Sequence, residues 1–373
     1  MSRVKFGDVV KDVKINIDRL NNPYEYYVAG DHMDSEDLTT HRKGRFATDD
    51  VGPAFIRVFK PGQILYGSRR TYLKKIAVAD FEGVCANTTF VFETKDPHAF
   101  EQRLLPFIML SKDFTTWSIA KSKGSTNPYV LFSDLADFEF ELPPLEEQKV
   151  LADKLWAAYR LKEAYKKLLV ATDEMLKSQF IEMFGNPLSL NQKNELKRLG
   201  ECCILNPRRP NIALCDTDKV SFIPMPAVSE DGYLVDMTDE EYGKVKKGFT
   251  YFENNDVLFA KITPCMENGK GAIVHGLTNG IGMGSTEFHV LRPINGISSP
   301  YWLLALTRMP IFRECAAKNM SGTGGQKRVS ASYLDHFMVG LPAIEEQRRF
   351  EAIYRQADKS KFELRKSIDA IDK

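Results

Sequence analysis

The sequence contains no run of about 18 consecutive apolar residues, which is the length that a membrane-spanning helix needs. Its opening residues, Met1 to Phe6, carry no apolar core of a secretion signal. The chain is therefore expected to be cytoplasmic, with no membrane among its partners. At 373 residues, with 43 % hydrophobic and 27 % charged residues, it is long enough for two or three domains with ordinary cores.

Signals for bound metals and cofactors are also missing. The six cysteines include no Cys-x-x-Cys pair, and the six histidines are not spaced as metal ligands. Neither a Walker loop nor a glycine-rich cofactor loop is present. We therefore expect reduced thiols, no metal and no cofactor, and we assign any ATP-driven step to a partner. The net charge of +1 is uninformative, because the distribution of charge over the surface decides nucleic-acid binding.

What the sequence does contain is a duplication with a shift of 199 residues. Residues 138–149 read FEFELPPLEEQK, and residues 337–348 read FMVGLPAIEEQR. A stretch without Gly or Pro follows each copy, the first from Leu145 to about Phe184 and the second from about Ile344 onward. These stretches predict two long helices. An unrelated pair of domains joined by a helical linker would not explain why the second helix repeats the first.

Both predicted helices carry residues that step by alternating fours and threes, which places them in a seam on one helix face. Lys162 and Lys361 occupy equivalent seam positions, and we expect their stems to pack while their ammonium groups reach solvent. The seams consist of Leu151, Leu155, Ala158, Lys162, Tyr165, Leu169 and Thr172, and of Phe350, Tyr354, Ala357, Lys361, Leu364, Ile368 and Ile371.

The segment before each helix has short β-rich runs bounded by Gly and Pro. In the first segment the runs are 55–59, 64–66, 75–78 and 88–92, followed by a predicted helix over 97–118, and in the second they include 256–259, 271–274 and 285–290. This repeated pattern of strands and helices predicts an α+β protein in which one fold is built twice. We expect domains at 1–141 and 187–340, helices at 142–186 and 341–373, and pairing of the helices as an antiparallel coiled coil with pseudo-twofold symmetry.

The segments 142–148 and 341–347 resemble the start of the long helices in type I restriction–modification specificity (S) subunits, and 179–187 (QFIEMFGNP) is similar to the end of that family's central helix. The resemblance covers essentially the whole chain. It implies a non-catalytic subunit that binds double-stranded DNA, each recognition domain reading one half of a bipartite target. It also implies association with two methyltransferase (M) subunits and, in the full complex, with restriction (R) subunits.

Direct readout of bases uses Arg, Lys, Asn, Gln and small hydroxyl residues on segments that can enter a groove. Two such loops occur in each half, although a solvated hairpin or a flexible connector would have similar composition. The candidate DNA-binding residues of the first loop are Ser68, Arg69, Arg70, Tyr72 and Lys74, with Lys261, Thr263, Asn268 and Lys270 in the second half. Those of the second loop are Lys123, Ser125, Thr126 and Asn127, with Ser321, Thr323, Gln326, Lys327 and Arg328 in the second half.

An apolar belt lies beside the seam of the first helix, at Leu161, Leu168 and Met175. It is wider than a two-helix coil needs. We expect it to bind helices of the methyltransferase subunits.

Signals for independent catalysis are weak. Asn127-Pro128-Tyr129 matches only part of a methyltransferase active-site turn. Asp80 with Glu93 and Lys95 could form a nuclease triplet that holds Mg²⁺. A purely structural coiled-coil connector is a further alternative.

Because the two halves differ in their loops, the expected DNA target is asymmetric.

Overall fold

The computed structural model describes residues 2–18, 21–186, 195–323 and 325–372. The chain divides into two compact units, Met1–Leu161 and Lys162–Lys373. The expected domain boundary at 187 and the final residue, 373, lie outside the described residues. Within the described ranges, no helix combines the length and the apolar character that crossing a membrane requires.

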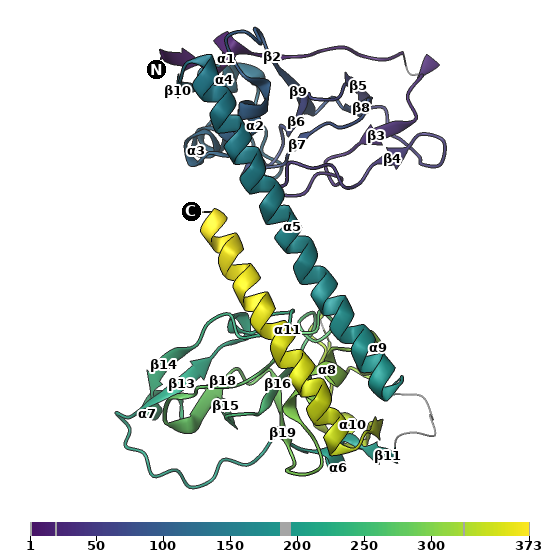
Figure 1. Ribbon diagram of the computed structural model, residues 1–373, viewed down its shortest axis with the longest axis vertical. Helices are drawn as coiled ribbons and strands as arrows, with labels where there is room; N and C mark the ends of the chain where they lie inside the picture. Colours follow the sequence, from purple (N-terminus) through teal and green to yellow (C-terminus); the bar gives the residue numbers. More distant parts are fainter. Residues whose placement is uncertain (1, 19–20, 187–194, 324, 373) are drawn as a thin grey trace. The chain divides into compact units, whose positions relative to one another are not determined.

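The first unit contains two four-stranded sheets and one two-stranded sheet (Figure 1). Their strand orders are β2-β9-β6-β7, β4-β3-β8-β5 and β1-β10. The elements are β1 (Ser2–Lys5), α1 (Phe6–Val9), β2 (Val10–Asp12), β3 (Tyr26–Val28), β4 (Gly44–Arg45), β5 (Phe55–Phe59), β6 (Ile64–Gly67), η2 (Thr71–Leu73), β7 (Ile76–Val78), β8 (Gly83–Ala86), β9 (Thr89–Thr94), η3 (Gln102–Leu104), α2 (Leu105–Leu110), α3 (Lys112–Lys121), α4 (Phe132–Ala136), β10 (Glu139–Leu142) and the start of α5 (Leu145–Phe184).

The second unit repeats this plan. Its sheets have the orders β12-β19-β16-β17, β14-β13-β18-β15 and β11-β20. The elements are β11 (Glu195–Arg198), α6 (Leu199–Cys202), β12 (Cys203–Leu205), β13 (Lys219–Ile223), η4 (Met225–Ala227), β14 (Thr238–Glu241), α7 (Tyr242–Val245), β15 (Thr250–Glu253), β16 (Val257–Ala260), β17 (Gly271–Ile273), η5 (Thr278–Gly280), β18 (Ile281–Gly284), β19 (Phe288–Pro293), α8 (Pro300–Arg308), α9 (Pro310–Lys318), α10 (Ala331–His336), β20 (Met338–Leu341) and α11 (Ile344–Ile371).

The two units agree in strand direction as well as in order. Among the described residues, each has one parallel strand pair, β3 with β8 and β13 with β18, in an otherwise antiparallel sheet. In each unit, the first strand pairs with the strand that precedes the long helix, through registers such as Val4 opposite Phe140 and Lys197 opposite Val339. The prediction that one fold is built twice is confirmed.

A glycine in the first short helix of each unit permits a close helix contact. An added Cβ on Gly7 in α1 would lie 2.6 Å from the Cβ of Ala136 in α4. At the equivalent Gly200 in α6, an added Cβ would lie 2.0 Å from Oδ1 of Asp335 in α10. These contacts explain why both repeats place a glycine at this point of the chain.

The helix predicted over 97–118 is not continuous. The segment forms η3, α2 and α3, and Ser111 separates the last two with an extended ψ of 152°. The Ser111 hydroxyl accepts a hydrogen bond from the backbone N–H of Phe114 at 3.2 Å, so this serine caps α3 and ends α2. The prediction of a single helix was wrong because a capping residue was read as a helical one.

The long helices begin at Leu145 and Ile344, and the first ends at Phe184, as the stretches without Gly or Pro predicted. The seam on α11 is confirmed by burial of Phe350, Tyr354, Ala357 and Lys361. The seam was wrong at Leu151, which is 41 % exposed. The neighbouring Ala152 is instead buried in the core of the first unit.

The expectation that Lys361 reaches solvent was also wrong. Only 1 % of this residue is exposed, and its Nζ lies 2.7 Å from Oδ1 of Asp173. The ion pair allows the charge to remain in the seam, because a buried cation with a carboxylate partner is far less costly than an unpaired one.

In the second unit, α11 runs beside the later part of α5 (Figure 1). The ring of Phe350 packs edge-on against Phe180 and Phe184, with both centroid distances 5.5 Å. Lys162 forms a further ion pair with Asp372. These contacts show that the two helices pack against each other.

Candidate nucleic-acid interface

The two predicted loops of the first unit pair with each other. The loop after β6 meets the loop after α3, through the backbone N–H of Arg70 donating to the Pro128 carbonyl at 2.7 Å. The N–H of Val130 donates to the Ser68 carbonyl at 2.9 Å, and Tyr129 forms isolated β-bridges with both Arg69 and Lys123. Residues far apart in the sequence therefore share one surface.

The second unit joins its loops in the same way. The Thr263 N–H donates to the Lys327 carbonyl at 3.0 Å, and the Val329 N–H donates to the Lys261 carbonyl at 3.0 Å. Arg328 forms β-bridges with Ile262 and Ser321, so it takes the place that Tyr129 has in the first unit. The sequence shift of 199 residues between Tyr129 and Arg328 matches this structural equivalence.

Local conformation and hydroxyl contacts position the first loop in each unit. In the first unit, Arg70 and Lys74 adopt left-handed backbone angles, with φ of 52° and 47°, on either side of η2. Thr71 is buried, and its hydroxyl lies 3.0 Å from that of Ser122 in the second loop. In the second unit, the Thr263 hydroxyl donates to the Gly325 carbonyl at 2.6 Å. Each loop pair is thus held by side chains as well as by the backbone.

The candidate residues of the first unit differ in availability. Arg69, Arg70 and Tyr72 are exposed, as are Ser125, Thr126 and Asn127. Ser68 is buried, and its hydroxyl donates to the Thr88 carbonyl.

Two candidate lysines of this unit are engaged by acidic residues. Lys74 pairs with Glu36, and Lys123 pairs with Asp134 at 2.9 Å. Arg69, Arg70, Tyr72 and the tip of the second loop therefore remain the accessible candidates of this unit.

In the second unit, Ser321, Thr323, Gln326 and Lys327 are exposed, whereas Lys261, Thr263 and Lys270 are half-buried. The amide of Asn268 donates to Glu230 at 2.8 Å. Apart from Asn268, the exposed candidates lie on the second loop, so the two units present different chemistry from equivalent positions.

Arg328 is held by a fork-shaped contact. Its Nε lies 2.9 Å from one carboxylate oxygen of Glu287, and its Nη2 lies 2.7 Å from the other. The hydrogen bonds from Arg328 lower the pKa of Glu287. Arg328 is therefore a positioned guanidinium with part of its hydrogen-bonding capacity already used.

Tyr129 was not among the predicted site residues, although it lies between the two loops and is 42 % exposed. An exposed aromatic ring at this point can contact bases or sugars. Its equivalence to Arg328 under the 199-residue shift is the signal that could have identified it.

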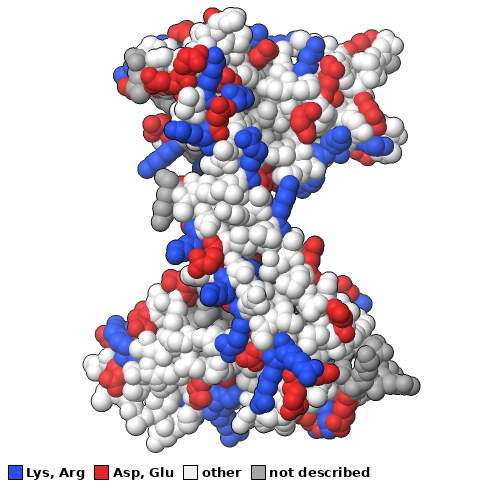
Figure 2. All heavy atoms as spheres, viewed as in Figure 1, with Lys and Arg blue, Asp and Glu red and all other residues white. Residues whose placement is uncertain are grey.

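Charges of both signs are interspersed over the face that Figure 2 displays. The near-zero net charge is thus reflected in a mixed surface on this face. The local composition of the loop pairs, rather than the charge of a whole face, is what distinguishes the candidate interface.

The residues considered for independent catalysis have other contacts. Nζ of Lys95 donates to the Gly7 carbonyl at 2.6 Å, and Glu93 accepts from the Gln63 amide at 3.2 Å. Asn127 and Tyr129 belong to the loop pair described above.

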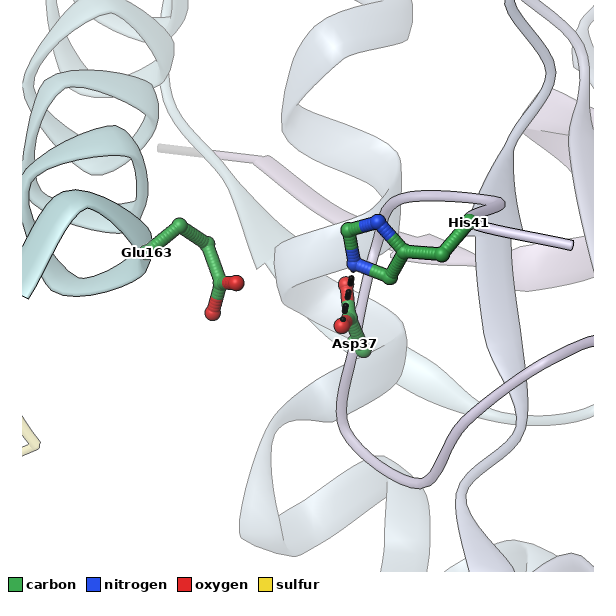
Figure 3. A group of neighbouring side chains, drawn as sticks. All are labelled: Asp37, His41 and Glu163. Atoms are coloured by element: carbon green, nitrogen blue, oxygen red, sulfur yellow. Dashed lines mark hydrogen bonds and ion pairs between the residues drawn. The ribbon is translucent and has the colours of Figure 1, made fainter. Parts of the chain in front are cut away.

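A polar cluster ties a loop of the first unit to α5. Nε2 of His41 lies 2.9 Å from Oδ2 of Asp37 (Figure 3). The Tyr159 hydroxyl donates to the other oxygen of Asp37, and it also accepts from the Leu38 N–H at 3.0 Å. Burial opposes ionisation of Asp37, but the hydrogen bonds, led by that from Tyr159, outweigh it and lower the pKa of this carboxyl.

The predicted belt on α5 is exposed. Leu161, Leu168 and Met175 are 45 %, 51 % and 42 % exposed. Exposed alanines at 157, 164 and 171 extend them into a heptad-spaced apolar face. The positions shifted by 199 residues on α11 are mostly polar, namely Gln356, Ser360, Glu363, Ser367 and Ala370. This face therefore occurs on α5 and is not repeated on α11.

Comparison with known proteins identifies relatives of this chain. Over 136 residues it is 43 % identical to the type I restriction enzyme EcoAI specificity subunit of Escherichia coli, covering 36 % of this chain and 23 % of that protein. Over 166 residues it is 37 % identical to the EcoEI specificity subunit of the same organism, covering 44 % and 27 %. The matched segments thus span about a quarter of each of these relatives.

Among solved structures, the type I restriction–modification system S subunit from M. genitalium is similar in fold, with a TM-score of 0.58, 13 % identity, and coverage of 100 % of this chain and 92 % of that one. The model of the type I restriction modification DNA specificity domain matches this chain twice, at residues 55–169 and 191–371. Because these two matches take in most of the chain and fall one on each repeat, the protein belongs to the type I restriction modification DNA specificity family.

Proposed function

We propose that this protein is the DNA-recognition subunit of a type I restriction–modification enzyme. Each repeat reads one half of a bipartite target in double-stranded DNA. The chain is not itself catalytic, and methylation and cleavage belong to its partners, two methyltransferase subunits and, in the full complex, restriction subunits. Membership of the specificity family and the names of the relatives support this assignment.

The observation that carries the proposal is the loop pair built twice on the same strand framework. A bipartite target with two different half-sites suits a protein with two similar recognition domains that carry different contact residues. The first unit offers Arg69, Arg70 and Tyr72, while the second offers Thr323, Gln326 and Lys327. Arginine suits guanine, and glutamine suits adenine, so the half-sites should differ.

The recognition domains are assigned to 1–141 and 187–340, and the joining helices to 142–186 and 341–373. We infer that the helices pair antiparallel as a coiled coil, with pseudo-twofold symmetry between the repeats. The contacts support this direction, because Lys162 meets Asp372, Asp173 meets Lys361, and Phe184 meets Phe350. As the residue number rises on α5, it falls on α11.

The exposed belt at Leu161, Leu168 and Met175 is assigned to binding a methyltransferase helix. An apolar stripe of heptad spacing on an exposed helix matches the surface that another amphipathic helix would cover. Because α11 lacks the stripe, the helices of both methyltransferase subunits are assigned to the belt on α5.

The test is single-molecule methylation sequencing in a methylation-free host that expresses the cognate methyltransferase subunit with and without this chain. A bipartite adenine-methylated motif that appears only with the chain establishes the function and reveals both half-sites. If the two proteins co-purify but no motif appears, DNA recognition is contradicted. If they do not co-purify, the proposed partnership fails as well.

A further inference from the structure

The loop pairs of the two units share one backbone frame. The carbonyl of Thr88 accepts a hydrogen bond from the first loop at 3.1 Å in the first unit, and the carbonyl of Glu287 does so at 2.9 Å in the second. Thr88 and Glu287 are 199 residues apart, as are Tyr129 and Arg328. In each unit, therefore, the residue directly before β9 or β19 lies at the same point beside the loop pair.

The side chains in this frame differ between the units. In the first unit, Arg69 of the first loop is bridged to Tyr129 of the second loop. In the second unit, Ile262 of the first loop is bridged to Arg328 of the second. The arginine of the bridge thus lies on opposite loops in the two units. Glu287, which pairs with Arg328, stands where the first unit has a threonine, so the acid and its arginine occur together in the second unit.

Both ends of the ion pair are anchored through the backbone. The Glu287 N–H donates to the Ser285 hydroxyl at 3.2 Å. The Arg328 N–H donates to the Ser321 carbonyl at 2.8 Å, and the Arg328 carbonyl accepts from the Ser321 N–H at 3.0 Å. The side chains of Arg328 and Glu287 are 40 % and 27 % exposed. A partly exposed pair of this kind contributes little to folding stability, so its main effect is on the orientation of the guanidinium.

The fork leaves part of the guanidinium available to a ligand. Glu287 accepts from Nε and Nη2 of Arg328, and the Gln326 carbonyl accepts from Nη1 at 3.3 Å. Because a guanidinium has five N–H donors, one N–H on each terminal nitrogen is left by these contacts. Guanine presents two acceptors, O6 and N7, in the major groove, and arginine binds them as a pair. Adenine presents a donor beside N7, so it cannot accept both hydrogen bonds.

We propose that Glu287 is a positioning residue that presents Arg328 to a guanine in the half-site of the second unit. This inference rests on the proposed function and adds the identity of one base to it. A guanidinium held in place before DNA arrives loses less conformational freedom on binding than a free side chain does. The first unit has Tyr129 at this point, so its half-site is read without this contact.

The first test is methylation sequencing of variants of the full chain, expressed with the methyltransferase subunit in a methylation-free host. Arg328→Met removes the paired contact, so discrimination should fall by about 5- to 150-fold at one guanine of one half-site. Glu287→Gln keeps the size of the side chain but removes its charge, and it should relax the same position to a smaller degree. An unchanged motif in Arg328→Met, or relaxation at a base other than guanine, overturns the proposal.

The matched control is Glu241→Gln. Glu241 forms a partly exposed ion pair with Lys244 in the same unit, at 3.2 Å, on a strand that carries none of the candidate residues. This variant should keep the original motif. Absence of any motif with the unaltered chain would contradict the proposed function, and this inference with it.

The second test separates base readout from a structural role of Glu287. Replacing the identified guanine with 7-deazaguanine removes the N7 acceptor, whereas hypoxanthine keeps both major-groove acceptors. Fluorescence anisotropy of the complex with the methyltransferase subunit should show weaker binding to the 7-deazaguanine duplex than to the unmodified and hypoxanthine duplexes. Glu287→Gln should reduce this difference, and Arg328→Met should abolish it.

The double variant completes this second test. If Glu287 acts through Arg328, adding Glu287→Gln to Arg328→Met should not change the relative affinities for the three duplexes any further. Equal weakening of all three duplexes by Glu287→Gln alone would identify a structural residue and overturn the positioning role. A larger difference between the duplexes in Glu287→Gln would mean that Glu287 withholds Arg328 from DNA, which also overturns the proposal.

Discussion

Gln148 and Gln347 make the same three hydrogen bonds in the two repeats. The side-chain oxygen of Gln148 accepts from the Glu101 N–H at 2.8 Å, and its nitrogen donates to the carbonyls of Ala99 and Pro143. Gln347 accepts from the Ser299 N–H at 2.8 Å and donates to the carbonyls of Ile297 and Pro342. Each glutamine fastens the first turn of its long helix to the body of its repeat, which explains the repeated Glu-Glu-Gln sequence.

Replacing this glutamine with an apolar residue should destabilise the protein. In Gln347→Leu, the buried N–H of Ser299 and two carbonyls lose their partner, and a buried unsatisfied group costs about 1–3 kcal/mol. The free energy of unfolding, from urea denaturation, should fall by at least this amount. Gln356→Leu, at an exposed position of α11, is the control and should change it by no more than about 0.5 kcal/mol. Equal stability of the two variants would contradict the structural role of Gln347.

The repeated framework could be predicted from the sequence because it depends on short-range patterns. Heptad spacing identified the buried Phe350 and Tyr354, and turn residues bounded the β-rich runs that became β5 and β6. The partner of Lys361 could not be found in this way, because Asp173 lies 188 residues away in the chain. Burial was wrongly predicted for Leu151 for a related reason. A heptad pattern does not show whether Leu151 or the adjacent Ala152 packs against the core of the first unit.

The candidate interface was predicted in composition but not in arrangement. Loop spacing singled out Arg69 and Lys327, which are exposed. The pairing of loops through Tyr129, the enclosure of Ser68 and the fork between Arg328 and Glu287 all depend on contacts between distant segments. The residues next to each of these positions in the sequence do not predict such contacts.

Exposed loop arginines should contribute to DNA affinity through counterion release. Arg69→Ala/Arg70→Ala should weaken binding and reduce the slope of log K against log salt by about one for each phosphate contact removed. Fluorescence anisotropy over a salt series with the cognate duplex measures both quantities. Lys60→Ala is the control, because this exposed lysine precedes β6 whereas the arginines follow it. Binding that is independent of salt in the unaltered protein would contradict a DNA-facing basic loop.

The stability of the second unit should depend on the protonation of His289. Nε2 of this ring lies 2.9 Å from the Val329 carbonyl, and Nδ1 lies 3.0 Å from the amide nitrogen of Asn206, an arrangement that suits the neutral ring. Burial lowers the pKa of His289, and the nearby Lys261 acts in the same direction, while the Val329 carbonyl and Glu287 oppose them. The neutral ring therefore belongs to the folded state.

The sign of the pH effect follows from this lowered pKa. Below about pH 6.5 the unfolded chain binds a proton at this histidine before the folded chain does, so stability should fall as the pH decreases. Urea denaturation at pH 7.5, 6.5 and 5.5 measures the trend. His289→Gln should be less stable at neutral pH but should show a smaller loss on acidification. His98→Gln, at an exposed position, should keep the original slope, and an unchanged slope in His289→Gln would contradict this assignment.

Charging the belt on α5 should separate partner binding from folding. Leu161 and Leu168 are exposed, so Leu161→Glu/Leu168→Glu should leave the unfolding midpoint nearly unchanged. The same charges would have to be buried if a methyltransferase helix covers the belt, and burying an unpaired carboxylate strongly disfavours association. Co-purification of the methyltransferase subunit should therefore be lost.

The repeat itself supplies the control for this experiment. Ser360→Glu/Ser367→Glu places the same two charges at the equivalent positions of α11, where the apolar face is absent. Co-purification should persist in this variant, because no apolar contact is removed. If both variants retain the partner, the belt is not its binding surface. If both lose it, the two helices are used alike, and binding does not depend on the apolar face that distinguishes α5 from α11.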